Sequence, residues 1–206
     1  MRRNIPEKSI QRLLIYYRYL NFLLQQGSRD ISSKSLADML EIKASQVRKD
    51  LSYFGQLGKR GSGYDVLALR DKIAQILEIG RVIKACVVGM GNLGTALAAY
   101  KGFAALGIKL VAVFDNSPQK VGRKIRGFTC LDINQLDKEI KAHDIKLAIL
   151  AVPSDSAQET AAKLEKSHIR AILNFTPVKL SLSRAVKVRS VDLATELKTL
   201  SFFMKD

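Results

Sequence analysis

Cysteine and histidine are scarce in this 206-residue sequence, with two of each. Cys86 and Cys130 are too few for a disulfide framework, and with His143 and His168 they lack the spacing of metal ligands. A disulfide-stapled secreted fold and a structural zinc site are therefore excluded, and we expect no bound metal. Cys86 is expected in the core and Cys130 partly exposed. This cysteine usage is typical of a reducing cytoplasm, which is the expected location.

Long hydrophobic runs are also missing from the sequence. No segment reaches the roughly 20 apolar residues that a membrane-spanning helix needs. The first ten residues, MRRNIPEKSI, carry positive charge but lack the apolar stretch of a secretory signal. We expect no membrane association.

Acidic residues are outnumbered, with 19 Asp and Glu against 34 Lys and Arg, which gives a net charge of +15 and a pI near 9.9. Residues 1–60 hold 12 basic and 5 acidic side chains, so this part is more than twice as basic per residue as the remainder. Such a charge indicates a partner rich in phosphate, although it says nothing about the fold.

Residues 1–80 are predicted to form a winged helix-turn-helix domain. Apolar residues at helical spacing predict one helix between Pro6, which suits the first turn, and Gly27. A second helix follows an N-cap at Ser32 or Ser33, and a third covers residues 44–54. The short turn between the last two favours a crossed pair of the helix-turn-helix type.

The segment after the third helix is basic and rich in glycine. Residues 55–64 are expected to form the hairpin of a wing, followed by a strand at 65–67 and a helix over 68–80. Gly80 is the expected domain boundary.

The third helix has the properties of a recognition helix. Val47, Leu51 and Phe54 would form its buried face, and the polar side chains of its N-terminal half would point outward, where base edges and phosphates can be reached. A solvated basic face on a helical cap is the competing interpretation. The predicted DNA-binding residues, including two in the wing that would reach backbone or minor groove, are Ser45, Gln46, Arg48, Lys49, Tyr53, Lys59 and Arg60.

Residues 81–190 are predicted to form a Rossmann-like domain. Apolar runs that suit parallel strands covered on both faces occur at 85–88, 110–114, 147–152 and 171–174. Helical stretches alternate with them at 93–106, 132–142, 156–167 and 180–185. An α/β fold with a doubly covered parallel sheet follows.

A glycine-rich turn joins the first of these strands to the next helix. In the pattern GxGxxG, the first glycine makes the tight turn, the second lets the backbone approach a pyrophosphate, and the third brings helix against strand. The helix N-terminus then offers N–H groups to the anion. The predicted cofactor-binding residues of this turn are Gly89, Met90, Gly91, Asn92, Leu93 and Gly94.

Asp115 ends the second strand, about 20 residues after the glycine turn, where a ribose-binding carboxylate is expected. A carboxylate there repels a 2′-phosphate, so NAD(H) is favoured over NADP(H). Residues at two later strand ends would line the nicotinamide end of the site, and connecting loops are the competing interpretation. These residues are Val152, Pro153, Asn174 and Phe175.

A proton donor for hydride transfer is not evident. His143 and His168 fall away from the predicted strand ends, and no second, substrate-holding domain follows the sheet. The cofactor is therefore expected to be bound without a reaction, and the protein is not expected to be an enzyme. The tail, residues 191–206, is predicted as an amphipathic helix whose apolar face a second subunit could cover.

Several segments together resemble the Rex family of bacterial redox-sensing repressors. They are QVRKDLSYFG at 46–55, GKRG at 58–61, GYDV at 63–66, GMGNLG at 89–94 with Ala96, Leu97 and Tyr100, VFD at 113–115, NFTP at 174–177, and the tail from Val191 to Phe203. The resemblance covers nearly the whole chain.

The resemblance implies a homodimer that binds palindromic operator DNA when NADH is scarce and releases it when NADH accumulates, with the C-terminal helix exchanged between subunits. It further implies that Arg48 and Lys49 contact the operator and that Tyr100 and Asp192 belong to contacts that change with the cofactor. Leu193 departs from relatives that carry an aromatic residue there, which leaves open how the tail meets the nicotinamide pocket.

Two other functions stay open from the residues. One is a small NAD-dependent oxidoreductase with a helical cap, against which the missing proton donor argues. The other is a CoA-binding or nucleotide-binding regulatory domain coupled to DNA, because a parallel sheet with a glycine-rich first turn serves both ligands.

Overall fold

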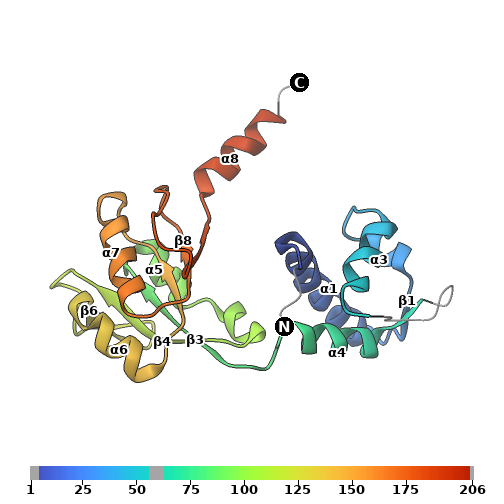
Figure 1. Ribbon diagram of the computed structural model, residues 1–206, viewed down its shortest axis with the longest axis horizontal. Coiled ribbons are helices and arrows are strands. Elements are labelled where there is room, and N and C mark those ends of the chain that lie inside the picture. Colours follow the sequence, from blue (N-terminus) through green and yellow to red (C-terminus); the bar gives the residue numbers. More distant parts are fainter. Residues whose placement is uncertain (1–4, 56–62, 205–206) are drawn as a thin grey trace. The chain divides into compact units, whose positions relative to one another are not determined.

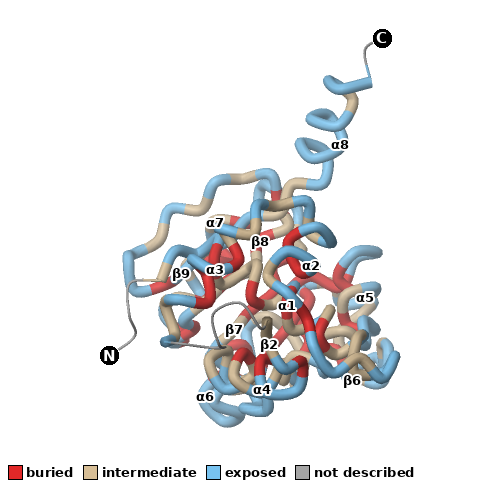
Figure 2. The backbone as a smooth tube through the Cα atoms, turned by 90° about the vertical axis from the view of Figure 1, so that its right-hand side faces the viewer, coloured by how far each residue is buried: buried red, intermediate tan, exposed pale blue. Residues whose placement is uncertain are grey.

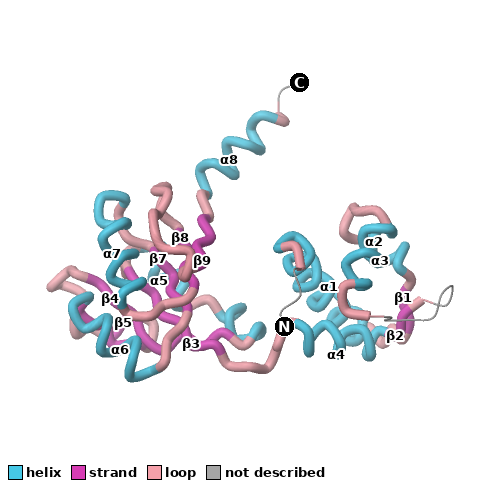
Figure 3. Tube along the Cα trace, viewed as in Figure 1, coloured by secondary structure: helices cyan, strands magenta, loops and turns pink. Residues whose placement is uncertain are grey.

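Helix α1 (Glu7–Gln25) opens the N-terminal unit of the computed structural model, which describes residues 5–55 and 63–204. By its internal contacts the chain divides into two units, Met1–Arg81 and Val82–Asp206. Figure 1 shows the helices of the first unit and the sheet of the second, and Figure 3 marks helices and strands by colour. Pro6 is the N-cap of α1 and so lies one position before the predicted first turn.

The helix-turn-helix pair is α2 (Ser33–Asp38) and α3 (Ala44–Ser52). Ser32 caps α2, because its hydroxyl accepts a hydrogen bond from the Ser35 amide at 2.9 Å. Glu41 adopts a left-handed conformation, φ 51°, in the tight turn between the helices. The predicted helices are confirmed, although α3 ends two residues before Phe54.

A short antiparallel ribbon joins β1 (Asp30–Ile31) to β2 (Tyr64–Asp65), and α4 (Val66–Ile76) follows without a break. The prediction of a strand over residues 65–67 is therefore wrong after Asp65. The reason is a cap: the Asp65 carboxylate accepts a hydrogen bond from the Ala68 amide at 2.6 Å and starts the helix there. Most of the predicted wing, residues 56–62, lies outside the described residues.

One apolar cluster holds the N-terminal unit together, with contributions from all four helices and from the ribbon. Figure 2 shows its buried positions in red. Its buried members are Leu13, Tyr16, Leu20, Ile31, Leu36, Ala37, Val47, Leu51, Val66, Leu69 and Ile73.

The second unit is built on a seven-stranded sheet in the order β5-β6-β4-β3-β7-β8-β9. All neighbours pair in parallel except β5 with β6. Without β5, the chain order of the strands reads 3-2-1-4-5-6, which is that of a doubly wound dinucleotide-binding fold. The strands are β3 (Ile83–Val88), β4 (Ile108–Asp115), β5 (Lys124–Ile125), β6 (Phe128–Asp132), β7 (Leu147–Leu150), β8 (Ala171–Asn174) and β9 (Lys187–Ser190).

Both faces of the sheet are buried, as continuous apolar strands require. In the central strand, Cys86 and Val88 pack into a cluster with residues of α6 (Leu136–His143) and α7 (Ser154–Lys166). Val87 faces the opposite side, toward Met90 and Ala98, the last residue of α5 (Asn92–Ala98). The four predicted core strands are confirmed. The edge strands β5 and β9, and β6 next to β5, were not predicted.

The helix predicted over residues 93–106 is two elements, α5 and the 3-10 helix η1 (Lys101–Leu106). The Tyr100 ring lies over Gly102, where a Cβ atom would come within 2.5 Å of it, so glycine permits the break. The helix predicted from residue 132 begins later: β6 runs to Asp132, which caps the 3-10 helix η2 (Ile133–Gln135) before α6.

The helix predicted at residues 180–185 is wrong. Side chains of α7 bind the backbone of this segment in a non-helical conformation: Gln158 bonds the amide and carbonyl of Ser181, and Glu165 accepts from the Ser183 amide. The predicted tail helix is confirmed as α8 (Leu193–Phe202), none of whose residues is buried (Figure 2). The expectation of a partly exposed Cys130 is also wrong, because Cys130 lies in the core beside β4.

Candidate dinucleotide site and DNA-binding surface

The glycine turn between β3 and α5 has the geometry that the GxGxxG pattern predicts. Gly89 has φ 95°, and a Cβ atom there would lie 2.4 Å from the Ala151 carbonyl oxygen. A Cβ atom on Gly94 would lie 1.8 Å from the Gly89 carbonyl oxygen, so this glycine brings α5 against the turn. Gly91 differs, since nothing lies within 4 Å of its Cβ position. Its open side is where a ligand can approach the backbone.

A pocket of about 550 Å³ adjoins this turn, at the carboxyl ends of the central strands. Open α/β sheets bind ligands at this edge, beside the point where the strand order reverses. Seven predicted cofactor-binding residues line it: Gly89, Gly91, Asn92, Leu93, Asp115, Val152 and Pro153. Six further polar lining residues were not predicted, and they are Asn116, Ser117, Lys120, Asp155, Ser156 and Thr160.

Asp115 holds the two sides of this pocket together. One carboxylate oxygen accepts from the Met90 amide at 2.7 Å and from Lys120 Nζ at 3.0 Å, and the other accepts from the Ser117 amide at 2.8 Å. Burial by itself would raise the pKa of Asp115, but the hydrogen bonds from Ser117, Lys120 and Met90 outweigh it and hold the pKa below its usual value. Asp115 is therefore an anion at neutral pH with a fixed orientation.

Four other predicted cofactor residues do not line the pocket. Met90 and Gly94 are buried beneath it. Asn174 is fully buried and bonds within its own turn, to Thr176, and to Val178 and Ser190. Phe175 packs against the core cluster on one face of the sheet. The structure therefore does not bring the 174–175 turn into this pocket, and its contact with a cofactor stays a prediction.

The two predicted switch residues lie apart from the glycine turn. Tyr100 is 56 % exposed, stacks edge-on against Phe103 at 5.0 Å, and lines a second, apolar pocket of about 360 Å³. Asp192 is the N-cap of α8, where its carboxylate accepts from the Ala194 and Thr195 amides. Hydrogen bonds from Thr195 hold the pKa of Asp192 below its usual value.

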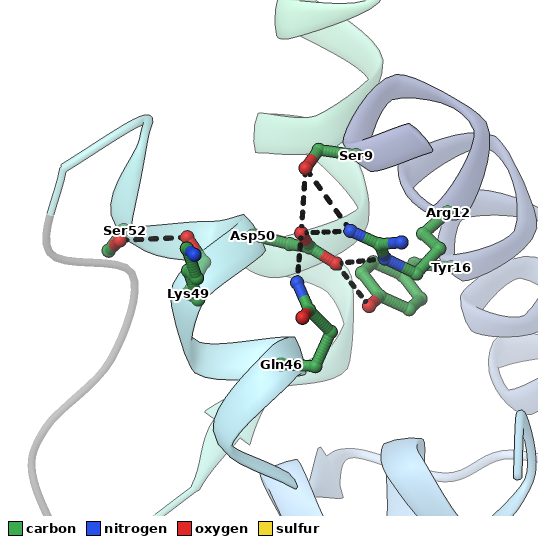
Figure 4. Close-up of polar contacts among 7 residues, drawn as sticks. All are labelled: Ser9, Arg12, Tyr16, Gln46, Lys49, Asp50 and Ser52. Atoms are coloured by element: carbon green, nitrogen blue, oxygen red, sulfur yellow. Dashed lines mark hydrogen bonds and ion pairs between the residues drawn. The ribbon is translucent and has the colours of Figure 1, made fainter. Parts of the chain in front are cut away.

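In the N-terminal unit, the fully buried carboxylate of Asp50 ties α3 to α1 (Figure 4). Arg12 donates to both of its oxygens, at 2.5 and 2.7 Å, Ser9 and Gln46 donate to one of them, and Tyr16 donates to the other at 2.8 Å. Burial would raise the pKa of Asp50, but the hydrogen bonds it accepts, that of Arg12 above all, hold the pKa below its usual value. This network was not predicted from the sequence.

The outward face of α3 carries most of the predicted DNA-binding residues. Ser45, Arg48 and Lys49 are exposed, and Gln46 is half-buried because it bonds to Asp50. Arg48 also donates from its guanidinium group to the Ser33 hydroxyl of α2 at 3.1 Å, which links the two helices.

The remaining predicted contacts lie after α3. Tyr53 is half-buried, with its ring 6.5 Å from that of Phe54 in an edge-on arrangement. Lys59 and Arg60 lie outside the described residues. Within the described ranges no cluster of His, Cys, Asp or Glu could hold a metal ion, and no helix has the length and apolar character to cross a membrane.

Comparison with known proteins covers both units. Residues 4–52 match the family described as "Putative DNA-binding protein N-terminus", and residues 81–178 match the family described as "CoA binding domain". The chain is 43 % identical over 203 residues to the redox-sensing transcriptional repressor Rex 1 of Thermotoga maritima, which covers 98 % of this chain and 97 % of that one. It is 44 % identical to Rex of Desulfitobacterium hafniense, across 96 % of this chain and 94 % of the relative.

Solved structures of a Rex-family repressor, RSP, are similar along the whole chain. RSP in complex with NAD+ and operator DNA matches with a TM-score of 0.92 and 36 % identity, covering 97 % of this chain and 92 % of that chain. RSP in complex with NADH matches with a TM-score of 0.88 and 35 % identity, covering 98 % and 94 %.

A helix-turn-helix unit joined to a dinucleotide-binding fold defines a ligand-responsive transcriptional regulator. This class accommodates the basic N-terminal surface and the glycine-turn pocket in one chain. The chain belongs to the Rex family of redox-sensing transcriptional repressors. Its relatives are named repressors rather than oxidoreductases, which resolves the first of the open functions against an enzyme.

Proposed function

We propose that this chain represses transcription as a cytoplasmic homodimer that binds palindromic operator DNA and is released when NADH binds. In this proposal residues 1–80 bind DNA, residues 81–190 bind NADH or NAD+, and residues 191–206 serve dimerisation. The proposal rests on one observation: the same chain has an exposed cationic helix, α3, and a glycine-turn pocket that contains an anionic Asp115.

The pocket can distinguish dinucleotides by charge. Gly91 leaves its backbone open to a pyrophosphate, and the Asp115 carboxylate suits ribose hydroxyls while repelling a 2′-phosphate. The charge on oxidised nicotinamide makes its transfer to apolar surroundings less favourable than that of the reduced ring. These features support NAD(H) over NADP(H) or CoA as the ligand.

NADH can release DNA only if its affinity differs between the DNA-binding state of the dimer and the state that does not bind DNA. A ligand shifts an equilibrium between two protein states only if it binds one of them more tightly, and a tenfold loss of operator affinity corresponds to about 1.4 kcal/mol. Two recognition helices can read a palindrome only when their spacing fits one turn of DNA, about 34–36 Å. NADH therefore needs to favour a dimer in which that spacing is lost.

Titration of NADH with and without operator DNA tests this function. Because coupling is reciprocal, operator must weaken NADH binding by the same factor by which NADH weakens operator binding. A gel shift on a palindromic promoter fragment, with NADH and NAD+ added separately, measures how far each nucleotide weakens operator binding. A single NADH dissociation constant in both titrations would contradict the proposal.

Removing either exposed cation of α3 is expected to weaken operator binding by tenfold or more, since Arg48→Ala and Lys49→Ala each delete a groove or phosphate contact. NADH affinity should not change, because neither residue is in the dinucleotide unit. Fluorescence anisotropy with labelled operator measures the loss. Lys138→Ala, which removes an exposed cation from α6, is the matched control and should bind as wild type does. Wild-type operator affinity in Arg48→Ala would exclude Arg48 from the interface.

Neutralising Asp115 is expected to change cofactor preference. Asp115→Asn keeps the shape of the side chain but removes the negative charge beside Lys120, which then faces the pocket as an uncompensated cation. We expect the ratio of NADH to NADPH affinity to fall by about tenfold or more, through the repulsion that is lost. Calorimetric titration with both nucleotides measures the ratio, and an unchanged ratio would place the 2′ position away from Asp115.

A further inference from the structure

Gln46 is the one predicted DNA-contacting side chain of α3 that is tied into the buried network (Figure 4). Its amide nitrogen donates to an Asp50 oxygen at 3.0 Å, across one turn of the helix. In Figure 4 the nitrogen faces Asp50 and the carbonyl oxygen lies on the other side.

The chemistry of Asp50 fixes this orientation. An ionised carboxylate can only accept hydrogen bonds, so the group of Gln46 that meets it has to be the NH2 and not the oxygen. Asp50 is fully buried and ion-paired with Arg12, and its pKa lies below the usual value. A flipped Gln46 amide would place two acceptor oxygens against each other and leave a buried lone pair unsatisfied.

We infer that Asp50 locks Gln46 so that Gln46 presents its carbonyl oxygen to the major groove, and thereby selects a base with an exocyclic amino group. This inference rests on the proposed function, in which α3 enters the groove. The major-groove edges that donate are the N6 amino group of adenine and the N4 amino group of cytosine, whereas guanine and thymine offer acceptors there. Glutamine can also bind adenine through both N6 and N7.

The lock makes Gln46 a specificity-determining residue and Asp50 the positioning residue behind it. A rigid acceptor rejects guanine and thymine at its position, since their acceptor atoms would oppose the Gln46 oxygen. The Gln46 nitrogen keeps a second N–H besides the one at Asp50, so a contact to adenine N7 is compatible with the lock. One position in each half-site is therefore read through its amino group.

Selection from random duplex DNA identifies that position and requires no assumption about the operator sequence. Full-length wild-type protein and Gln46→Met, which has a similar length but lacks the amide, are each used to select sequences. Gln46→Met is expected to relax the preference at one position per half-site, occupied by adenine or cytosine in the wild-type selection. Gln75→Met makes the same change on the exposed face of α4 and should leave the selected sequence unchanged.

Base analogues at that position then test the lock. Removing the amino group, by purine for adenine or 2-pyrimidinone for cytosine, is expected to weaken wild-type binding about tenfold and to have no effect on Gln46→Met. Wild-type binding that does not change when the amino group is removed would overturn the lock, as would a Gln46-dependent guanine or thymine.

Failure of the proposed function gives a different result. If wild-type protein selects no sequence, the operator function itself fails, and this inference fails with it. If wild-type protein selects a palindrome and Gln46→Met selects the same one at every position, only the inference fails. Melting temperature and NADH affinity of Gln46→Met, expected to match wild type within a few degrees and twofold, exclude loss of the fold.

Discussion

Asp50→Ala is expected to lower the free energy of unfolding of the N-terminal unit by about 3–5 kcal/mol, the usual cost of removing one member of a buried ion pair. The variant leaves the Arg12 guanidinium and three neutral donors without the acceptor around which they are arranged. Domains are stable by only about 5–15 kcal/mol, so a large part of the stability of this unit would be lost. Denaturant unfolding followed by far-ultraviolet circular dichroism measures the change.

The matched control is Asp38→Ala, which removes an exposed aspartate from the last turn of α2 and should cost about 0.5 kcal/mol or less. The pH dependence gives a second check on Asp50. Because its folded pKa lies below the unfolded value of about 3.9, its contribution is present above that pH and is lost as the pH falls through the folded pKa. Asp50→Asn should lack this acid-sensitive component. Equal unfolding midpoints for Asp50→Ala and wild type would contradict a structural role for the network.

The burial of Asp50 was not predicted from the sequence. Charged residues on a helix are solvated in most proteins, and no separate role was expected for Asp50. The signal was present, however: Asp50 lies three residues after Val47 and one before Leu51, on the stripe that forms the buried face. A carboxylate on such a stripe needs donors, which Arg12 and its neighbours on α1 supply from 34 or more residues away.

The sheet was predictable in its centre and not toward its edges. Four of the five inner strands, β4, β3, β7 and β8, are continuous apolar runs because both of their faces are covered. β9, with the sequence KVRS, has one partner strand and mostly exposed side chains, so no hydrophobic pattern marks it. The nearby segment 180–185 has helical composition, but bonds from Gln158 and Glu165 of α7 decide its conformation.

In the pocket, too, the predicted residues are those fixed by a local sequence pattern, and the residues that were not predicted depend on how the chain folds back. The glycine turn and Asp115 follow from a local pattern whose spacing reflects one strand-helix-strand unit. Lys120 was missed because its pairing with Asp115 depends on how the intervening turn folds back. Asn174 was placed at the correct edge of the sheet, yet the strand-end rule does not say where a side chain points, and this one bonds within its own turn.

Gly94→Ala is expected to destabilise the dinucleotide unit by about 3 kcal/mol or more, at the upper end of overpacking costs. Its Cβ atom would lie 1.8 Å from the Gly89 carbonyl oxygen, and this backbone contact cannot be relieved by rotating a side chain. α5 would have to move away from the turn, and the pocket with it. Thermal unfolding measures the loss, and a melting temperature equal to that of wild type would contradict the close approach.

Gly91→Ala is the matched variant that separates folding from binding. Nothing lies within 4 Å of its Cβ position, and its φ of −71° suits alanine, so the fold should persist. The added methyl group occupies the side from which a pyrophosphate would approach, and we expect NADH affinity to fall by tenfold or more. Operator affinity without NADH should equal that of wild type, while NADH concentrations that release the wild-type protein should leave Gly91→Ala bound. NADH can release DNA only as far as it binds the DNA-free state of the dimer more tightly than the DNA-bound state. Release of Gly91→Ala at the same NADH concentration as wild type would therefore show that NADH acts from a place other than this turn.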